Sequence, residues 1–241
     1  MRCQYLYVKK MKHNTILLHG LFGGLSNWTG VIEHFEQHLN IHVPELPLYE
    51  KYEGDTVEYL VDFLDRTITD TNLESVVLVG NSLGGHIAIR YAHRFPSKVA
   101  KLILTGSSGL YENTQFGSFL KRSDYNYIRE RVAATFYDPN LATDELVAEV
   151  MATTTNLAKC FAIIRAAKST KKDNMLMSLP EIKMPVLLIW GQDDKITPPD
   201  VAWQFKDNLQ DATLITLTEC GHAPMMEKPV EFNQALEGFL F

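Results

Sequence analysis

The sequence of 241 residues has few cysteines, no concentrated basic charge and no long apolar run. Its three cysteines, Cys3, Cys160 and Cys220, are an odd number without metal-ligand spacing, which favours reduced thiols over a disulfide framework. The formal net charge of -6, with no Lys/Arg stripe, argues against nucleic acid as a partner. No apolar run approaches the roughly 18 residues that a membrane helix needs, so we expect no membrane span.

The N-terminal segment MRCQYLYVKKMKHN mixes charged and aromatic residues and lacks the apolar core of a signal peptide. We therefore expect a cytoplasmic protein. Hydrophobic residues make up 46% of the chain and charged residues 22%, which is ordinary for a globular protein. The length fits one domain with a large core, or one domain that carries an insertion.

Short β-rich runs alternate with amphipathic segments along the chain. Most of these runs are apolar on both alternating faces, as in strands that are covered on two sides. They are TILLH (15–19), IHVPEL (41–46), SVVLVG (75–80), KLILTG (101–106), PVLLIWG (185–191) and ATLITL (212–217). The main helical patterns between and after them lie at 28–39, 56–68, 86–95 and 231–240. This alternation predicts an α/β fold with a mostly parallel central sheet and helices on both faces.

One long interval between the fourth and fifth runs breaks this alternation. It contains helical patterns at 123–137, 143–154 and 156–169. A connection of this length inside a compact sheet is usually functional. We therefore predict a helical cap at 109–180, inserted into a core formed by 1–108 and 181–241; an extra helical layer without a role at a site is the alternative.

A G-x-S-x-G pattern, Gly80-Asn81-Ser82-Leu83-Gly84, closes the third run and opens a helical segment. In this setting a serine can stand on a tight, strained turn with its hydroxyl exposed, and the glycines leave room for the neighbouring backbone. The pattern also approaches the dinucleotide-binding G-x-G-x-x-G. We reject that interpretation because Ser82 replaces the middle glycine and no acidic residue ends the next run.

A serine hydroxyl needs a base to take its proton and an acid to orient that base. His222 lies in the loop after the sixth run, and Asp193 and Asp194 directly follow the fifth. Loops at strand ends are where open α/β sheets gather their catalytic groups. The order Ser82, Asp194, His222 is the serine–acid–histidine order of the α/β hydrolases.

Four segments in this order resemble the serine hydrolases of the α/β-hydrolase fold, over a stretch from about Thr15 to the C-terminus. They are HGLFGG (19–24), GNSLGGH (80–86), WGQDDKITPP (190–199) and CGHAPMMEKP (220–229). The resemblance implies that Ser82 is the nucleophile, His222 the base and Asp194, four residues before a proline, the orienting acid. Asp193 would then accept backbone hydrogen bonds within the turn.

The same resemblance implies the remaining site. The oxyanion hole would use the N–H groups of Leu83 and of Leu21, with Phe22 as the alternative to Leu21. The residues expected to contact substrate are Phe22, Asn27, Asn81, Phe161 and Arg165. We expect no metal and no cofactor, since His34 and His38 lie four apart on a helix without an acidic third ligand nearby.

These residues predict a hydrolase that forms an acyl-enzyme with a small-molecule ester or related acyl substrate. A carboxylesterase for small or medium apolar esters is the first choice. The alternative is a carbon–carbon hydrolase of the meta-cleavage type, whose G-N-S-[M/L]-G-G elbow, Ser26-Asn27 and Arg165 this chain resembles, although Ala223 stands where those enzymes tend to have tryptophan. A slow-turnover ligand receptor of the same fold is the alternative of another class.

Overall fold

The computed structural model of the chain describes residues 13–113 and 121–241. Each of the six apolar runs overlaps a strand: β1 (Asn14–Leu18), β2 (Asn40–His42), β3 (Val76–Asn81), β4 (Val99–Thr105), β5 (Val186–Gly191) and β6 (Ala212–Leu217). The run at 41–46 forms the shortest of them. β2 ends at His42, two residues before Pro44, which has no N–H group for a ladder.

The strands form one parallel sheet with the order β2-β1-β3-β4-β5-β6. The chain therefore adds β2 on one side of β1 and β3 on the other. In open α/β sheets, the crevice at such a reversal, outside the carboxyl ends of the strands, is the usual place for a ligand. The loops that follow β1 and β3 meet there, and these are the HGLFGG loop and the turn with Ser82.

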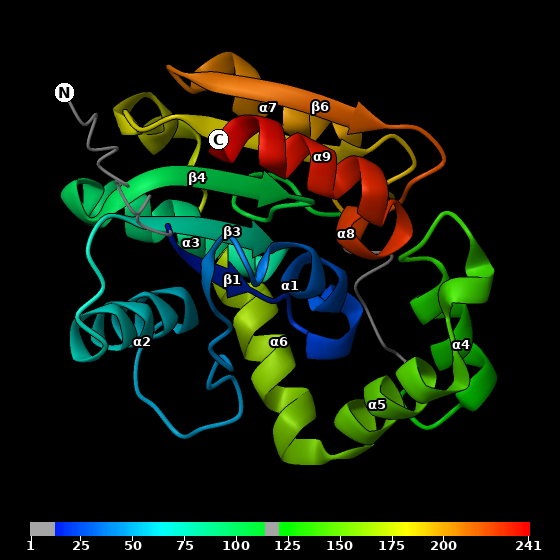
Figure 1. Ribbon diagram of the computed structural model, residues 1–241. Helices are drawn as coiled ribbons and strands as arrows, with labels where there is room; N and C mark the ends of the chain where they lie inside the picture. Colours follow the sequence, from blue (N-terminus) through cyan, green and yellow to red (C-terminus); the bar gives the residue numbers. More distant parts are fainter. Residues whose placement is uncertain (1–12, 114–120) are drawn as a thin grey trace, which may run out of the picture.

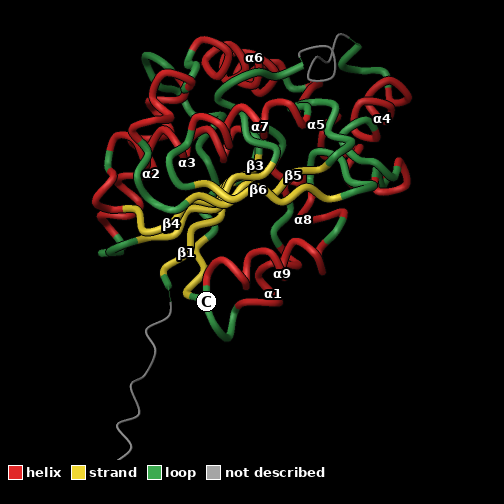
Figure 2. Tube along the Cα trace, turned by 90° about the horizontal axis from the view of Figure 1, so that it is seen from above, coloured by secondary structure: helices red, strands yellow, loops and turns green. Residues whose placement is uncertain are grey.

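Helices cover both faces of the sheet, as predicted (Figure 2). One face is covered by α1 (Thr29–Phe35) and α9 (Pro229–Leu240), and the other by α2 (Thr56–Asp70), α3 (Leu83–Arg94) and α7 (Pro199–Asn208). The side chains of β1 alternate between the two cores, because Ile16 and Leu18 lie in one cluster and Leu17 in the other. A short helix, α8 (Pro224–Glu227), precedes α9.

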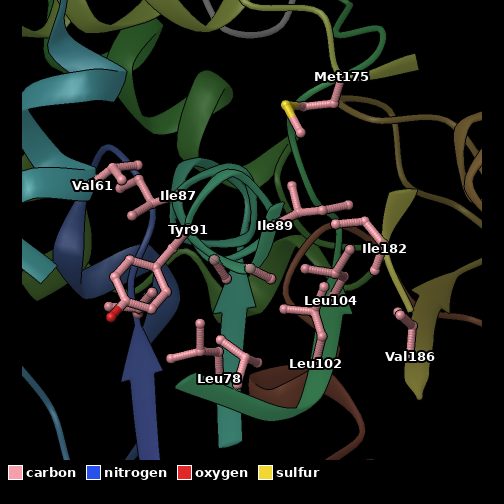
Figure 3. Close-up of a cluster of buried hydrophobic side chains, with 14 of the residues drawn as sticks. Val61, Leu78, Ile87, Ile89, Tyr91, Leu102, Leu104, Met175, Ile182 and Val186 are labelled. Atoms are coloured by element: carbon pink, nitrogen blue, oxygen red, sulfur yellow. The ribbon is translucent and has the colours of Figure 1, made fainter. Parts of the chain in front are cut away.

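The larger core anchors α3, the helix that begins directly after Ser82. Ile87 and Tyr91 of α3 are fully buried, together with Leu78 of β3 and Leu102 of β4 (Figure 3). Complete burial of a large aliphatic or aromatic side chain contributes about 1.5–3 kcal/mol. The start of α3 is therefore fixed by its packing.

In the described part of the interval between β4 and β5, three α-helices form the predicted helical insertion: α4 (Tyr125–Ala133), α5 (Asp144–Thr155) and α6 (Leu157–Lys172). Each begins after a residue whose side chain accepts a free N–H of the first turn, respectively Asp124, Thr143 and Asn156. Figure 1 shows the three helices gathered on one side of the sheet. The boundaries 109 and 180 stay a prediction, and residues 114–120 lie outside the described part.

Within the described residues, no single helix is both long and apolar enough to cross a membrane. The pair α5 and α6 reaches the required composition only when both helices are counted together, and the two are bent by 93°. Cys160 and Cys220 are free thiols, and burial raises the pKa of Cys220 far above its ordinary value. Cys3 lies outside the described residues.

Candidate active site

Ser82 stands between the last residue of β3 and the first residue of α3, with φ 54° and ψ −122°. Such a positive φ is rare for a residue other than glycine, and strain of this kind costs about 1–3 kcal/mol. Three backbone hydrogen bonds hold the turn. The Ser82 N–H donates to the Thr105 carbonyl at 3.2 Å, and the Ser82 carbonyl accepts from the N–H groups of His86 and Ser108, each at 3.1 Å.

The glycines of the turn are needed because backbone passes close to them. A Cβ atom at Gly80 would overlap the carbonyl of Gly84, and a Cβ atom at Gly84 would overlap the carbonyl of Leu18 in β1. Neither obstacle is a movable side chain. The steric reason that the sequence suggests for these two glycines is therefore confirmed.

Asp194 and His222 form a buried pair after β5 and β6. The His222 Nδ1–H group donates to Asp194 Oδ2 at 2.8 Å, and the two residues are only 5% and 3% exposed. Burial lowers the pKa of His222, but the charge and hydrogen bond of Asp194 raise it above its ordinary value overall. The pair thus has the geometry of a base oriented by an acid, with Nε2 left for another partner.

Asp194 also organises its own turn. Its Oδ1 accepts the N–H groups of Ile196 at 2.8 Å and Thr197 at 3.0 Å, and its Oδ2 accepts the Thr197 hydroxyl at 2.8 Å. Asp193, by contrast, has an exposed side chain. The expectation that Asp193 accepts the backbone hydrogen bonds of this turn is therefore wrong, because Asp194 accepts them while it also orients His222.

Asn81 connects the serine turn to the histidine loop. Its side chain is fully buried, and its amide donates to the carbonyl of Thr105 and to the carbonyl of His222, each at 3.0 Å. Its Oδ1 accepts the Ser26 hydroxyl at 2.6 Å. This occupied, buried amide does not fit the substrate contact expected from the sequence. A positioning role for Asn81 fits it instead.

The residues next to Ser82 and Thr105 also contact the His222 loop. Gly106, which follows β4 with φ +49°, would place a Cβ atom 2.8 Å from the His222 carbonyl oxygen and 2.9 Å from Nδ1, so a side chain there would displace the histidine. Ser82 Oγ does not hydrogen-bond to the His222 ring in the part of the chain that the structure describes. Such bonds are often long before substrate binds.

The loop after β1, which contains Leu21, lies beside Ser82. A Cβ atom at Gly20 would lie 3.2 Å from the Ser82 Cβ. His19 fixes the loop, because its ring Nδ1 bonds the Gly20 carbonyl at 2.8 Å while Nε2 accepts the Leu46 N–H at 3.1 Å. Burial lowers the pKa of His19, which favours this neutral ring.

The predicted oxyanion donors lie at suitable positions in the chain. Leu83 is the first residue of α3, where N–H groups lack helical partners, and Leu21 follows the Gly20 that approaches Ser82. Phe22, the alternative donor, precedes a 3-10 turn at Gly23–Ser26 and is partly buried against the core below α1. The assignment of these N–H groups stays a prediction.

The remaining candidates for substrate contact make other contacts. Asn27 is exposed, and its Oδ1 accepts the Thr29 N–H at 2.7 Å at the start of α1. Phe161 on α6 is 67% exposed. The Arg165 guanidinium lies 3.8 Å from the centre of the Tyr52 ring, in the loop before α2. None of these contacts is with Asp194 or His222, so the role of the three residues at the site stays a prediction.

Across the described residues, no group of three His, Cys, Asp or Glu side chains is placed to hold a metal ion. His34 and His38 are exposed on and just after α1, and their rings contact Phe35 and Phe241, with centroids 4.6 Å and 6.4 Å apart.

Several contacts around the site are not indicated by the local sequence. Thr197 bonds Asp194, Thr135 accepts the His222 N–H at 2.8 Å, and Glu227 accepts N–H groups on both sides of His222. Gly106 could have been noticed, since a glycine directly after a strand of an α/β sheet often permits a close approach. The other contacts depend on long-range packing.

The sequence model of the alpha/beta hydrolase family matches residues 15–235. The chain belongs to this family. A solved member from the metagenome of sediments from the lagoon of Mar Chica, Morocco, described as an alpha/beta hydrolase enzyme, is 38% identical, with a TM-score of 0.77 over 95% of this chain and 90% of its own. The chain is thus a hydrolase of the alpha/beta hydrolase family.

Two further family members differ in the activity that their names state. A pimeloyl-[acyl-carrier protein] methyl ester esterase of Nitrosomonas europaea is 27% identical over 90% of this chain and 91% of its own length. A 2-hydroxy-6-oxononadienedioate/2-hydroxy-6-oxononatrienedioate hydrolase of Paraburkholderia phymatum is 28% identical over 95% of this chain and 87% of its own. This chain is therefore similarly related, by sequence identity, to a named ester hydrolase and to a named dienoate hydrolase.

Proposed function

We propose that this hydrolase cleaves carboxylic esters with small or medium apolar acyl groups through an acyl-enzyme on Ser82. The observation that carries the proposal is the buried Asp194–His222 pair beside a strained serine turn. Residues 109–180 act as a cap over this site, and 1–108 with 181–241 form the core. The reaction uses side chains and backbone N–H groups of this chain, without a cofactor.

In the first half-reaction, Ser82 Oγ attacks the ester carbonyl carbon while His222 Nε2 takes the hydroxyl proton. Asp194 holds the ring with its proton on Nδ1 and stabilises the imidazolium that forms. The N–H groups of Leu83 and Leu21 donate to the carbonyl oxygen as it gains negative charge. The ester C–O bond then breaks, and His222 returns the proton to the departing alcohol.

In the second half-reaction, water attacks the acyl carbon and gives a proton to His222 Nε2. The bond between the acyl carbon and Ser82 Oγ breaks, and the proton passes back to the serine. The carboxylic acid leaves, and the starting enzyme is regenerated.

The name of the Nitrosomonas europaea relative supports an ester substrate. The second candidate, hydrolysis of a carbon–carbon bond in a dienoate, is supported by the Paraburkholderia phymatum relative. In this chain Arg165, which the sequence offers as a polar group for a dienoate, lies over the Tyr52 ring. A contact with a ring of this chain gives no specific support for a dienoate substrate, so the ester is the first candidate.

Labelling with a fluorophosphonate probe tests the nucleophile. We expect modification at Ser82 alone in the folded protein, and no modification in Ser82→Ala. Ser82→Ala and His222→Ala should each lose several orders of magnitude in kcat on p-nitrophenyl butyrate, and the double variant little more, because the groups act as a unit. Equal labelling of Ser82→Ala would remove Ser82 from the mechanism.

The substrate class is tested on a panel of esters, thioesters and dienoates with wild type and Ser82→Ala. We expect the highest Ser82-dependent kcat/KM on esters. A higher Ser82-dependent value on dienoates would establish the carbon–carbon hydrolase instead. A single burst of product without steady turnover on every substrate would indicate a receptor.

A further inference from the structure

Glu227, the last residue of α8, lies five positions after His222, and its carboxylate gathers backbone N–H groups from two parts of the chain. Oε1 and Oε2 accept the N–H of Gly221 at 2.9 and 3.0 Å, and Oε1 accepts the N–H of Ala223 at 3.2 Å. Gly221 and Ala223 are the two neighbours of His222. The carboxylate therefore holds the histidine loop from both sides.

The same carboxylate reaches the helical insertion. Oε2 accepts the N–H of Tyr137, four residues after α4, at 2.7 Å. Nearby, the His222 N–H donates to the Thr135 carbonyl at 2.8 Å. A Cβ atom at Gly221 would lie 2.6 Å from that carbonyl oxygen and 2.9 Å from the Tyr137 nitrogen. The histidine loop and the segment 135–137 are thus in direct contact, and Glu227 bridges them.

The half-buried Glu227 carboxylate accepts charge-assisted hydrogen bonds from three backbone N–H groups. Such bonds are strong and directional, so they fix the backbone more firmly than a surface ion pair would. Losing the charge would leave the N–H groups of Gly221, Ala223 and Tyr137 with a poorer acceptor. The charged neighbours of Glu227 among the described residues are Lys228, which pairs with Glu219 at 3.7 Å, and the acids Asp138, Asp194 and Glu219.

We propose that Glu227 is a positioning residue for His222, because its carboxylate fixes the loop 221–223 against the segment 135–137 in the arrangement that presents the histidine to Ser82 and Asp194. The inference rests on the proposed function, since it gives His222 the role of base. It adds a contact through which the helical insertion and the catalytic loop are held together.

The electrostatics supply an independent signature of this role. Burial raises the pKa of Glu227, the N–H groups of Tyr137, Gly221 and Ala223 lower it in opposition, and the Asp194 charge raises it further, so the net shift is upward. The Glu227 charge in turn raises the pKa of His222, together with the larger effect of Asp194 and that of Glu112. A neutral residue at 227 should therefore lower the pKa of His222.

The test compares Glu227→Gln with Glu219→Gln in the full-length protein, using steady-state kinetics on p-nitrophenyl butyrate from pH 5 to 9. Glu219 is a matched control, because it lies in the same loop and its 67% exposed side chain pairs only with Lys228 among the described residues. We expect the kcat of Glu227→Gln to fall about 10²-fold with KM little changed, because a displacement of His222 by about 1 Å can cost that much. The acidic limb of its kcat/KM profile should move to lower pH. Glu219→Gln should match wild type.

A folded Glu227→Gln with wild-type kcat and an unmoved acidic limb would overturn the positioning role. The proposed function would still stand in that case, as long as the activity is lost in Ser82→Ala. If Glu227→Gln does not fold, Glu227→Asp keeps the charge but shortens the reach. The kcat of Glu227→Asp should fall while the acidic limb of its kcat/KM profile stays in place. Wild-type kcat in Glu227→Asp would equally overturn the positioning role. Activity that survives in Ser82→Ala would instead overturn the proposed function.

Discussion

The strand-end loops and the helical insertion differ in how firmly their side chains are held. At the strand ends, Asn81, Asp194 and His222 are at most 5% exposed, and hydrogen bonds join them across elements that are distant in sequence. On α6 of the insertion, by contrast, the Phe161 side chain is 67% exposed. Groups that perform chemistry must be held closely in place, whereas a less constrained surface can adapt to different substrates. We therefore expect changes in the loops to alter rate and changes on α6 to alter preference.

The largest effect should come from Asp194, where the loop is most tightly bonded. Asp194→Asn keeps an Oδ1 that can accept the N–H groups of Ile196 and Thr197, so the turn should still form. The new amide, however, would face His222 Nδ1 with a donor, which forces the wrong tautomer. We expect a folded protein with kcat lowered by about 10⁴. Steady-state kinetics and a thermal melt measure the two properties separately.

Asp193→Asn is the matched control for that change, because Asp193 is adjacent and exposed. It should keep both the rate and the melting temperature of wild type, since its side chain is not the acceptor of the turn. A large loss of kcat in Asp193→Asn, with Asp194→Asn active, would reverse the assignment of the acid.

A smaller effect is expected at Asn81, which supports the loops without touching the reacting atoms. Asn81→Ala would leave the His222 carbonyl and the Ser26 hydroxyl without their buried partner. Leaving buried polar groups unsatisfied costs about 1–3 kcal/mol, so the free energy of unfolding should fall by that amount in urea titrations. The kcat should fall less than in Asp194→Asn, because the Asp194–His222 bond remains. Unchanged stability would contradict the bridging role of Asn81.

The fold and the candidate reacting residues could be predicted from the sequence, because local sequence patterns indicate both. Ser82 lies in a glycine-bounded turn, and Asp194 and His222 lie in the loops after two apolar strands, so their approximate placement follows from the parallel sheet. Whether Asp193 or Asp194 accepts the hydrogen bonds of the turn depends on which side chain points inward, and no periodic pattern in the sequence predicts that. Glu227 meets Tyr137 across 90 positions in the chain, a contact that only the packed structure reveals.

The orientation of the inserted helices likewise could not be predicted from the sequence. The helices α4, α5 and α6 follow from amphipathic patterns and capping residues. Which face of α6 turns toward the core is decided by packing against α2 and α5, and that packing places Arg165 over Tyr52. A substrate role for Arg165 therefore has to be tested directly.

The smallest effects on rate should come from Phe161 and Arg165. Phe161→Ala removes an exposed ring, so the free energy of unfolding should change by less than about 0.5 kcal/mol. Arg165→Ala removes a cation–π contact with Tyr52, which is worth about 0.5–1 kcal/mol at a partly exposed site. If the insertion selects the acyl group, both variants should keep wild-type kcat/KM on p-nitrophenyl acetate and lose activity selectively on longer acyl chains. The ratio of kcat/KM values on octanoate and acetate esters measures this selectivity. An equal change on both esters would show that α6 supports the fold without contacting the acyl chain, and the contrast between the two regions would then be one of stability alone.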